Sequence, residues 1–291
     1  MSKFYIQIAL FLLSIFAYAN NGTLATEPAP GTATKYQLKS RYATPEQIYI
    51  QNNHLLCTNS TETINAEKLM NEAATQLEHH AKNKEGYKLR IPYINNNMNF
   101  RIKKHEGTIV QRMNIKYYLS SKYNAIINML WDPAFANDFN NGSVKRKIVR
   151  VYSPNLVMIQ QRYKNSTFGR WKYFYALAAK VDVSKNTTAI VMTSANIIDH
   201  NRSSDEYKNK IIKNANLFKT EINSEDDIRS GKLKKTFVNI AGYLLEKTSA
   251  YINITYLESI DGHTSNYQKF ILEKALNKFF HYKNWSYCQS S

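Results

Sequence analysis

The sequence has few of the cysteines, prolines and glycines that are typical of small domains held by disulfides or rich in loops. Its 291 residues include two cysteines, six prolines and nine glycines. Two cysteines exclude a disulfide-rich scaffold, so the fold depends on a hydrophobic core, for which the chain is long enough. Cys57 and Cys288 would join an N-terminal segment to the C-terminus if they were bridged. The sequence leaves this disulfide open, because it does not show whether the two sulfurs lie within bonding distance.

The sequence also lacks the motifs of common catalytic and metal sites. It contains no G-x-S-x-G elbow, no P-loop, no Rossmann fingerprint, no HExxH and no CxxC. Its serines, histidines and acids show no spacing that ties them into a triad. The acidic run Glu225-Asp226-Asp227 is more typical of a solvated patch or a helix start than of a metal site. We therefore expect a protein that is not an enzyme and holds no metal or cofactor.

Long hydrophobic runs are missing everywhere except at the N-terminus. Phe4 to Phe16 is almost entirely apolar, follows Lys3 and precedes Ala17-Tyr18-Ala19. This pattern is typical of a secretory signal peptide and is too short for a comfortable membrane span; a retained N-terminal anchor is the alternative. We predict a signal peptide over residues 1–19, a flexible linker over 20–50 and one folded domain over 51–288 of a secreted protein.

Charge of one sign dominates, with a formal net charge of +17. The basic residues lie in short clusters, such as Lys103-Lys104 and Lys145-Arg146-Lys147, with acidic residues between them. This scatter, in a secreted chain, argues against nucleic acid as a partner. Transient contact with an anionic membrane surface is one interpretation of the charge, and a solvated surface with no specific partner is the other.

Hydrophobic periodicity predicts both helices and strands. Apolar residues at spacings of three and four predict a helix from Asn65 to Ala81, with Asn65 as its N-cap. The period changes to two from Thr108 to Leu119, which predicts a strand. Further strands are expected over 99–103, 147–152, 156–163, 171–183, 188–196, 234–246 and 251–260, with a short helix over 122–131 and an irregular segment over 200–232.

A long helix is predicted at the C-terminus, where Ser265 and Gln268 form a capping box and the apolar face up to Phe280 is wide. Consecutive strands joined by tight turns imply an antiparallel sheet, and a large twisted sheet curls. The predicted class is α+β, with this helix inside the curl. Periodicity leaves open whether the curl is fully packed or contains a cavity. The 21 tyrosines lean slightly towards a cavity, but ordinary sheet-surface tyrosines are an equal alternative.

Several blocks of sequence resemble one known family. They cover residues 147–162, 174–182, 190–196, 231–239 and 254–264. Together they are similar to the fam-a proteins of rodent malaria parasites, a secreted multigene family with a START-like domain, over residues 50–288. The resemblance implies the helix-grip fold, a curved antiparallel sheet wrapped around a long C-terminal helix with a lipid cavity. It also implies phospholipid transport, notably of phosphatidylcholine, and a location in the parasitophorous vacuole or the host red cell.

The resemblance implies less about the headgroup site. In a phosphatidylcholine-binding START protein, aromatic rings face the choline and an Arg–Asp pair binds the phosphate region. Tyr173 falls on one aromatic position. Ala136 and Asn140 stand where the arginine and aspartate would be, Ile159 where a tryptophan would be, and Asn239 where a tyrosine would be. These departures put the headgroup in doubt.

We expect Tyr173, Tyr175, Asn239 and Tyr243 to line the cavity, on strands that face the same curl. Asn239 lies in an apolar run, and a buried amide needs a partner: a lipid phosphate or ester, or a neighbouring backbone group. The segment 200–232 is a candidate gate for the lipid tails. The predicted function is a monomeric carrier that moves a phospholipid between membranes. The alternative is an exported surface or antigenic binding protein that uses the START-like core only as a scaffold.

Overall fold

The computed structural model describes residues 42–91, 98–118, 120–134, 144–164, 169–202 and 207–262. The predicted signal peptide, the linker up to residue 41, the predicted C-terminal helix and Cys288 lie outside these residues. The disulfide with Cys57 therefore stays a prediction. Within the described part, Cys57 is half-buried and its thiol donates to the carbonyl of Asn59 at 3.6 Å.

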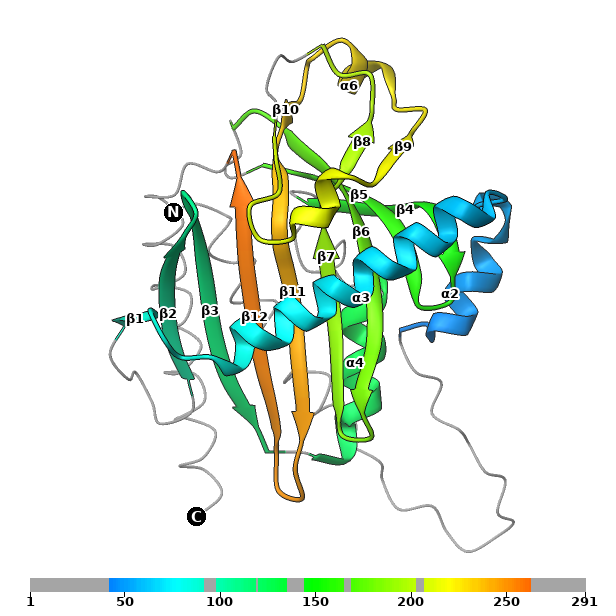
Figure 1. The fold of residues 1–291 in the computed structure, drawn as a ribbon. Coiled ribbons are helices and arrows are strands. Elements are labelled where there is room, and N and C mark those ends of the chain that lie inside the picture. Colours follow the sequence, from blue (N-terminus) through cyan, green and yellow to red (C-terminus); the bar gives the residue numbers. More distant parts are fainter. Residues whose placement is uncertain are drawn as a thin grey trace, which may run out of the picture.

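A large antiparallel sheet forms the centre of the molecule (Figure 1). Its strands follow the order β1-β2-β3-β12-β11-β7-β6-β5-β4, and the short β10 adds a parallel pair to β6. The strands on the main path are Lys88–Ile91 (β1), Met98–His105 (β2), Thr108–Tyr117 (β3), Val144–Ser153 (β4), Leu156–Tyr163 (β5), Lys172–Ser184 (β6), Thr187–Thr193 (β7), Phe237–Lys247 (β11) and Ile252–Asp261 (β12).

Hairpins connect most neighbours, and the centre of the sheet joins distant parts of the chain. The β2–β3 turn places Glu106 at φ 44° and Gly107 at φ 79°, as the predicted turn requires. Between β3 and β12, Tyr117 pairs with Ile252. Between β7 and β11, a Cβ on Gly242 would lie 2.1 Å from the carbonyl oxygen of Ile190, so only glycine fits this close approach.

Helix α3 (Ser60–Lys82) covers one face of the sheet. All six apolar positions of the predicted helix are buried: Ala66, Leu69, Met70, Ala73, Leu77 and Ala81. The helix begins earlier than predicted, because the side chain of Asn59 accepts a hydrogen bond from the backbone N–H of Glu62 and caps it there. Asn65 is an ordinary helical residue, so its predicted capping role was wrong.

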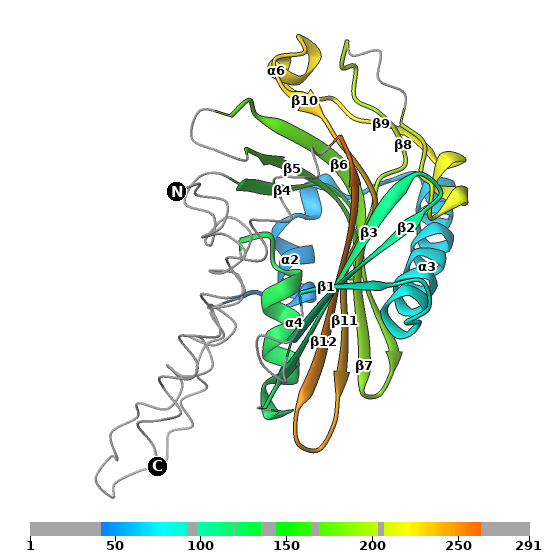
Figure 2. The same cartoon turned by 90° about the vertical axis from the view of Figure 1, so that its left-hand side faces the viewer.

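The other face carries two shorter helices, α4 (Tyr123–Trp131) and α2 (Pro45–Gln51). Figure 2 shows them on the side opposite α3, where β4 and β5 curl over them, so this is the concave side. Helix α2 lies in the range predicted as a flexible linker. Thr44 and Gln47 form a capping box and Ile48 is buried, which orders this part of the range.

A lobe of short elements joins β7 to β11. It contains the parallel pair β8 (Asn196–Ile198) and β9 (Lys219–Glu221), the 3-10 turn η3 (Lys213–Asn216), the helix α6 (Asp226–Arg229) and β10 (Lys234–Lys235). Further 3-10 turns, η1 (Asn53–Leu55) and η2 (Ser120–Lys122), lie elsewhere. Buried Ile212 and Ile228 belong to the same core cluster as α3. The segment 200–232, predicted to be irregular, contains three short elements, η3, β9 and α6, and its other described residues are irregular as predicted.

Candidate functional site

Side chains alternate between two cores, one on each face of the sheet. We call the face packed against α3 the α3 face, and its core includes Tyr173, Leu177 and Leu244. We call the concave face packed against α4 the α4 face, and its core includes Phe174 and Leu245. Successive residues of a strand point to opposite faces. Each functional side chain can therefore be assigned to one face.

A small enclosed cavity lies on the α4 face, with a volume of about 20 Å³. Helix α4 and the residues after it close one side, and five strands close the other. The lining residues are Leu130, Trp131, Pro133, Arg146, Ile148, Val157, Ile159, Ala178, Ile190, Met192 and Tyr243. Arg146 and Tyr243 bring a charge and a hydroxyl into an otherwise apolar or aromatic wall. Sites of this kind take ligands that are mainly apolar and have a few polar atoms.

Polar side chains accompany this cavity on the α4 face. The Nε and Nη2 atoms of Arg146 donate to Oε1 of Gln161 at 2.8 and 2.6 Å. On β12, the hydroxyl of Tyr256 donates to Glu258 at 2.5 Å, and the rings of Tyr243 and Tyr256 lie 5.0 Å apart. Burial raises the pKa of Glu258 and also that of Tyr243. The α4 face therefore holds ionisable groups in surroundings that disfavour charge.

Two of the predicted cavity residues lie on the opposite face. The hydroxyl of Tyr173 donates to Oδ2 of Asp199 at 2.9 Å, and that of Tyr175 accepts from Gln160 at 2.6 Å. Both tyrosines are buried in the core under α3. Burial first, then the Asp199 carboxylate, raise the pKa of Tyr173. The expectation that these tyrosines share the curl with Tyr243 is wrong, because positions 173 and 175 of β6 alternate with the concave positions 174 and 176.

Asn239 is fully buried, and its polar atoms have protein partners. Its Oδ1 accepts from the backbone N–H of Lys210 at 2.9 Å, and its Nδ2 lies 3.4 Å from Oγ1 of Thr108. A register shift in β11 between Val238 and Ile240 accompanies this position. Of the two partners considered for Asn239, the structure supplies the neighbouring backbone group. Only Tyr243, among the four predicted residues, lines the α4-face cavity.

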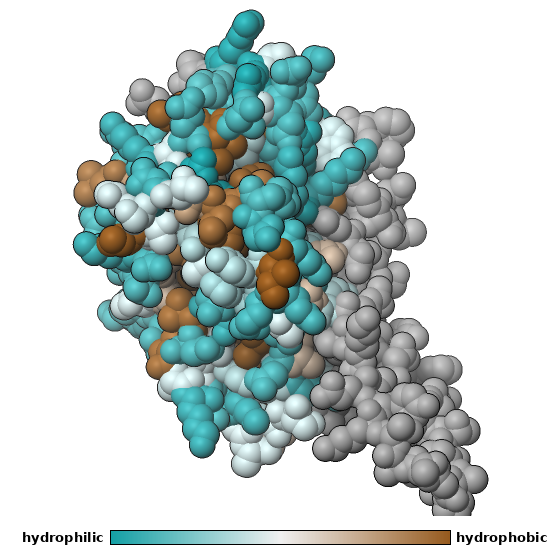
Figure 3. All heavy atoms as spheres, turned by 90° about the vertical axis from the view of Figure 1, so that its right-hand side faces the viewer, coloured by the Kyte–Doolittle hydropathy of each residue, from teal (hydrophilic) through white to brown (hydrophobic). Residues whose placement is uncertain are grey.

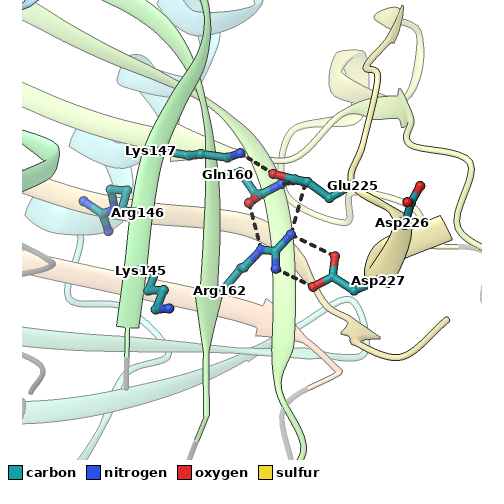
Figure 4. A pocket seen from close by; sticks show the side chains of 8 residues that line it. All are labelled: Lys145, Arg146, Lys147, Gln160, Arg162, Glu225, Asp226 and Asp227. Carbon is teal, nitrogen blue, oxygen red and sulfur yellow. Dashed lines mark hydrogen bonds and ion pairs between the residues drawn. The ribbon is translucent and has the colours of Figure 1, made fainter. Parts of the chain in front are cut away.

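The acidic run 225–227 forms part of an ion-pair network on the α3-face side of β4 and β5 (Figure 4). Arg162 binds Asp227 at 2.6 and 3.0 Å and Glu225 at 3.1 Å. Lys147 and Gln160 also donate to Glu225. Despite its burial, these hydrogen bonds lower the pKa of Glu225 to about 2. Arg146 leaves β4 on the side opposite Lys147.

This network borders an open groove of about 500 Å³, in which Lys147 and Arg162 bind Glu225 and Asp227. It therefore fastens the lobe to the sheet. Asp226 and Asp227 begin α6, as expected for a helix start, and Glu225 stands at the N-cap position without a side-chain capping hydrogen bond. This places part of the segment 200–232, the predicted gate, in a fixed position on the α3-face side.

The described residues contain neither a cluster of metal ligands nor a membrane-spanning helix. Across residues 42–262, outside the gaps given above, no three histidine, cysteine or acidic side chains gather as a metal site would require. In the same part of the chain, no helix has the length and hydrophobicity needed to span a membrane. The face shown in Figure 3 is largely hydrophilic, with hydrophobic side chains in small separate groups.

Two human proteins have solved structures with folds similar to that of this chain. Human StAR-related lipid transfer protein 5 is 12% identical with a TM-score of 0.51, over 74% of this chain and 93% of that chain. Human STARD10 is 11% identical with a TM-score of 0.50, over 74% of this chain and 81% of that chain. This chain has a START-like fold. The predicted α+β helix-grip class is therefore confirmed. No protein-family model matches the chain, and no curated protein matches its sequence.

Sequence reasoning missed Trp131 and Arg146 as functional residues. Arg146 was noted only as part of a basic cluster. It lies two residues from both Val144 and Ile148 on β4, so it shares the α4 face with them. A charged residue between two inward-pointing apolar ones is a signal that period-two analysis can detect. Trp131 carried no such signal, because the end of a short helix does not reveal what it faces.

Proposed function

We propose that this protein binds a lipid between α4 and the concave face of the sheet and carries it between membranes. The observation that carries this proposal is the apolar cavity on the α4 face, into which Arg146 and Tyr243 bring polar groups. It lies in a fold similar to that of human StAR-related lipid transfer protein 5. Each buried methylene of a lipid tail would contribute about 0.8 kcal/mol, so binding needs no chemistry.

Lipid entry requires the cavity to enlarge. A volume of about 20 Å³ holds roughly one water molecule. Helix α4 forms the wall that would move. Two polar contacts hold it and the residue after it: the hydroxyl of Tyr123 donates to Thr188 at 3.0 Å, and Asp132 accepts from the backbone of Ala43 at 2.8 Å. To enter, a lipid would break these contacts and displace α4 outward, rather than pass the lobe.

The finer parts of the proposal rest on the resemblance to fam-a proteins. It supports phosphatidylcholine as the lipid, secretion through the signal peptide at residues 1–19, and a final place in the parasitophorous vacuole or host red cell. The net charge of +17 supports transient contact with an anionic membrane during loading. We further propose that the carrier acts as a monomer without catalytic activity.

The small cavity favours a second candidate. If the core on the α4 face never opens, the START-like domain is a scaffold, and the protein is an exported surface or antigenic binding protein. The two candidates differ in one measurable property, since only the first takes up a lipid.

Transfer of fluorescent phosphatidylcholine between vesicles tests the proposal, with full-length protein made in a secretory host. Ala178 and Ala179 are adjacent buried residues of β6, on the α4 face and the α3 face respectively. Leucine at either position overpacks a core and costs about 1–3 kcal/mol of stability. We expect the larger side chain in Ala178→Leu to fill the cavity. Transfer should slow by about tenfold or more, because the lipid would lose its binding site.

Ala179→Leu is the matched control and should transfer at the wild-type rate per folded molecule. Equal losses in both variants would place the effect in stability rather than in the cavity. Absence of transfer of any phospholipid by folded wild-type protein would exclude the carrier and leave the scaffold candidate.

A further inference from the structure

One residue that lines the cavity on the α4 face carries a hydrogen-bond donor that no described residue satisfies. Trp131, the last residue of α4, is 7% exposed and lines the cavity. Its indole Nε1 is buried and has no hydrogen-bond partner in the part of the chain that the structure describes. A buried donor without an acceptor costs about 1–3 kcal/mol, so such groups usually have a reason to persist.

No described neighbour of Trp131 in the cavity accepts its N–H: the hydroxyl of Tyr243 has an acceptor oxygen but makes no hydrogen bond with it. Most of the wall is aliphatic, including Ile148, Ile159 and Met192. The charged lining residue, Arg146, carries only donors, because a guanidinium has no acceptor atom. An occupant of the cavity would therefore have to bring an acceptor oxygen for the indole N–H.

Resting on the proposed function, we infer that the indole N–H of Trp131 donates to an ester carbonyl oxygen of the bound lipid. A carbonyl oxygen is neutral, and an apolar wall accepts it at a smaller desolvation cost than a charged phosphate. An indole N–H is likewise a neutral donor. Trp131 would thus distinguish lipids by the linkage of their tails.

Two phosphatidylcholines with equal tails test this inference, one with ester linkages and one with ether linkages that lack the carbonyl oxygens. Dissociation constants are measured by native mass spectrometry with the full-length protein. We expect the wild type to bind the diester about fivefold more tightly than the diether, as one net hydrogen bond provides. Trp131→Phe keeps an aromatic ring but removes the N–H, and should bring the two lipids within twofold of each other.

Trp171→Phe is the control. Trp171 directly precedes β6 and is half-buried. It packs beside Lys145 and Lys164 and does not line the cavity. It should keep the wild-type preference. If Trp131→Phe does not fold, benzothienylalanine at position 131 replaces the N–H with sulfur in a ring of the same shape, and the same comparison applies.

The remaining outcomes separate this inference from the proposed function. If Trp131→Phe weakens both lipids equally, or if it keeps the fivefold preference, the carbonyl contact is excluded while lipid binding stands. Equal wild-type affinity for the two lipids also excludes it, and is the result expected if a buried water takes the N–H. If the folded wild type binds neither lipid, both the inference and the proposed function fail.

Discussion

On the α3 face, the buried carboxylate of Asp199 accepts from the hydroxyl of Tyr173 and pairs with Lys235, each at 2.9 Å. On the α4 face, Trp131 lines a cavity, and its indole N–H has no partner among the described residues. Both faces belong to the same strands, so their difference comes from what covers them. The long helix α3 and the lobe close one face, whereas the short helix α4 leaves a gap.

This difference separates the two tasks of the sheet. Buried polar groups that bind one another, as Asp199 binds Tyr173 and Lys235, contribute stability and offer nothing to a ligand. A face with an unsatisfied donor and a cavity loses stability, and can regain it from a ligand that supplies the missing atoms. Changes on the α3 face should therefore affect unfolding, and changes on the α4 face should affect ligand uptake.

The largest effect on stability is expected at Asp199. Asp199→Ala leaves the hydroxyl of Tyr173 and the ammonium of Lys235 without their shared acceptor, which should cost about 3–5 kcal/mol in urea unfolding. Lipid transfer per folded molecule should not change. Glu221→Ala is the control, because Glu221 pairs with His200 on the surface and should cost no more than about 1 kcal/mol. Similar losses in both variants would contradict the view that the α3 face is the stabilising one.

The second effect concerns His80, which is buried at the end of α3. Burial first, then the charges of His105, His79 and Lys103, lower its pKa to about 4 from 6.5. The unfolded chain binds a proton that the folded chain rejects, so stability should fall as the pH falls from about 6.5 to 4. The loss is about 3 kcal/mol, as the difference between the two pKa values requires.

Unfolding of His80→Gln across this pH range measures the effect. The variant should lose about 3 kcal/mol less than the wild type on acidification. The neighbouring His79 is exposed and its charge is only a lesser cause of the lowered pKa of His80, so His79→Gln should keep most of the wild-type pH dependence. A profile that changes in His79→Gln and not in His80→Gln would show that the wrong histidine has been assigned.

The smallest effect has the opposite sign and lies on the α4 face. Burial raises the pKa of Glu258, so this group should reduce stability as the pH rises above about 4.5, its ordinary value. Glu258→Gln should abolish that decline and be more stable than the wild type at pH 7, by less than the His80 effect. The control Glu246→Gln alters a residue that lies 3.9 Å from Lys82, and should give no such gain. A loss of stability in Glu258→Gln would end the contrast between the faces.

The elements of this fold were largely predictable, because period and turn chemistry are local. Leu156–Tyr163 was predicted with the bounds that the structure gives it. The faces were harder to predict. Tyr173 to Ala179 is buried throughout, since both sides of β6 are covered. A continuous buried run does not show which half of its residues points into the curl.

Other misses have particular physical causes. Asn239 sits at a register shift in β11, and a shift of one residue exchanges the faces. In the lobe, buried residues such as Ile212, Phe218 and Ile228 follow no regular spacing, so their burial left no periodic signal. The cavity depends on the length of α4 and on the reach of Arg146 from β4. Both are properties of tertiary packing.

The pairing of β3 with β12 has a consequence for how the chain is made. Tyr117 of β3 pairs with Ile252 of β12, so the two halves of the sheet can join only after residue 252 has been synthesised. Contacts between such distant segments form slowly, because a long loop must close first. During synthesis, the edge of β3 therefore stays open until almost the whole domain has emerged. A chain cut short before Ile252 would keep this edge unpaired, and an unpaired edge recruits strands from other molecules.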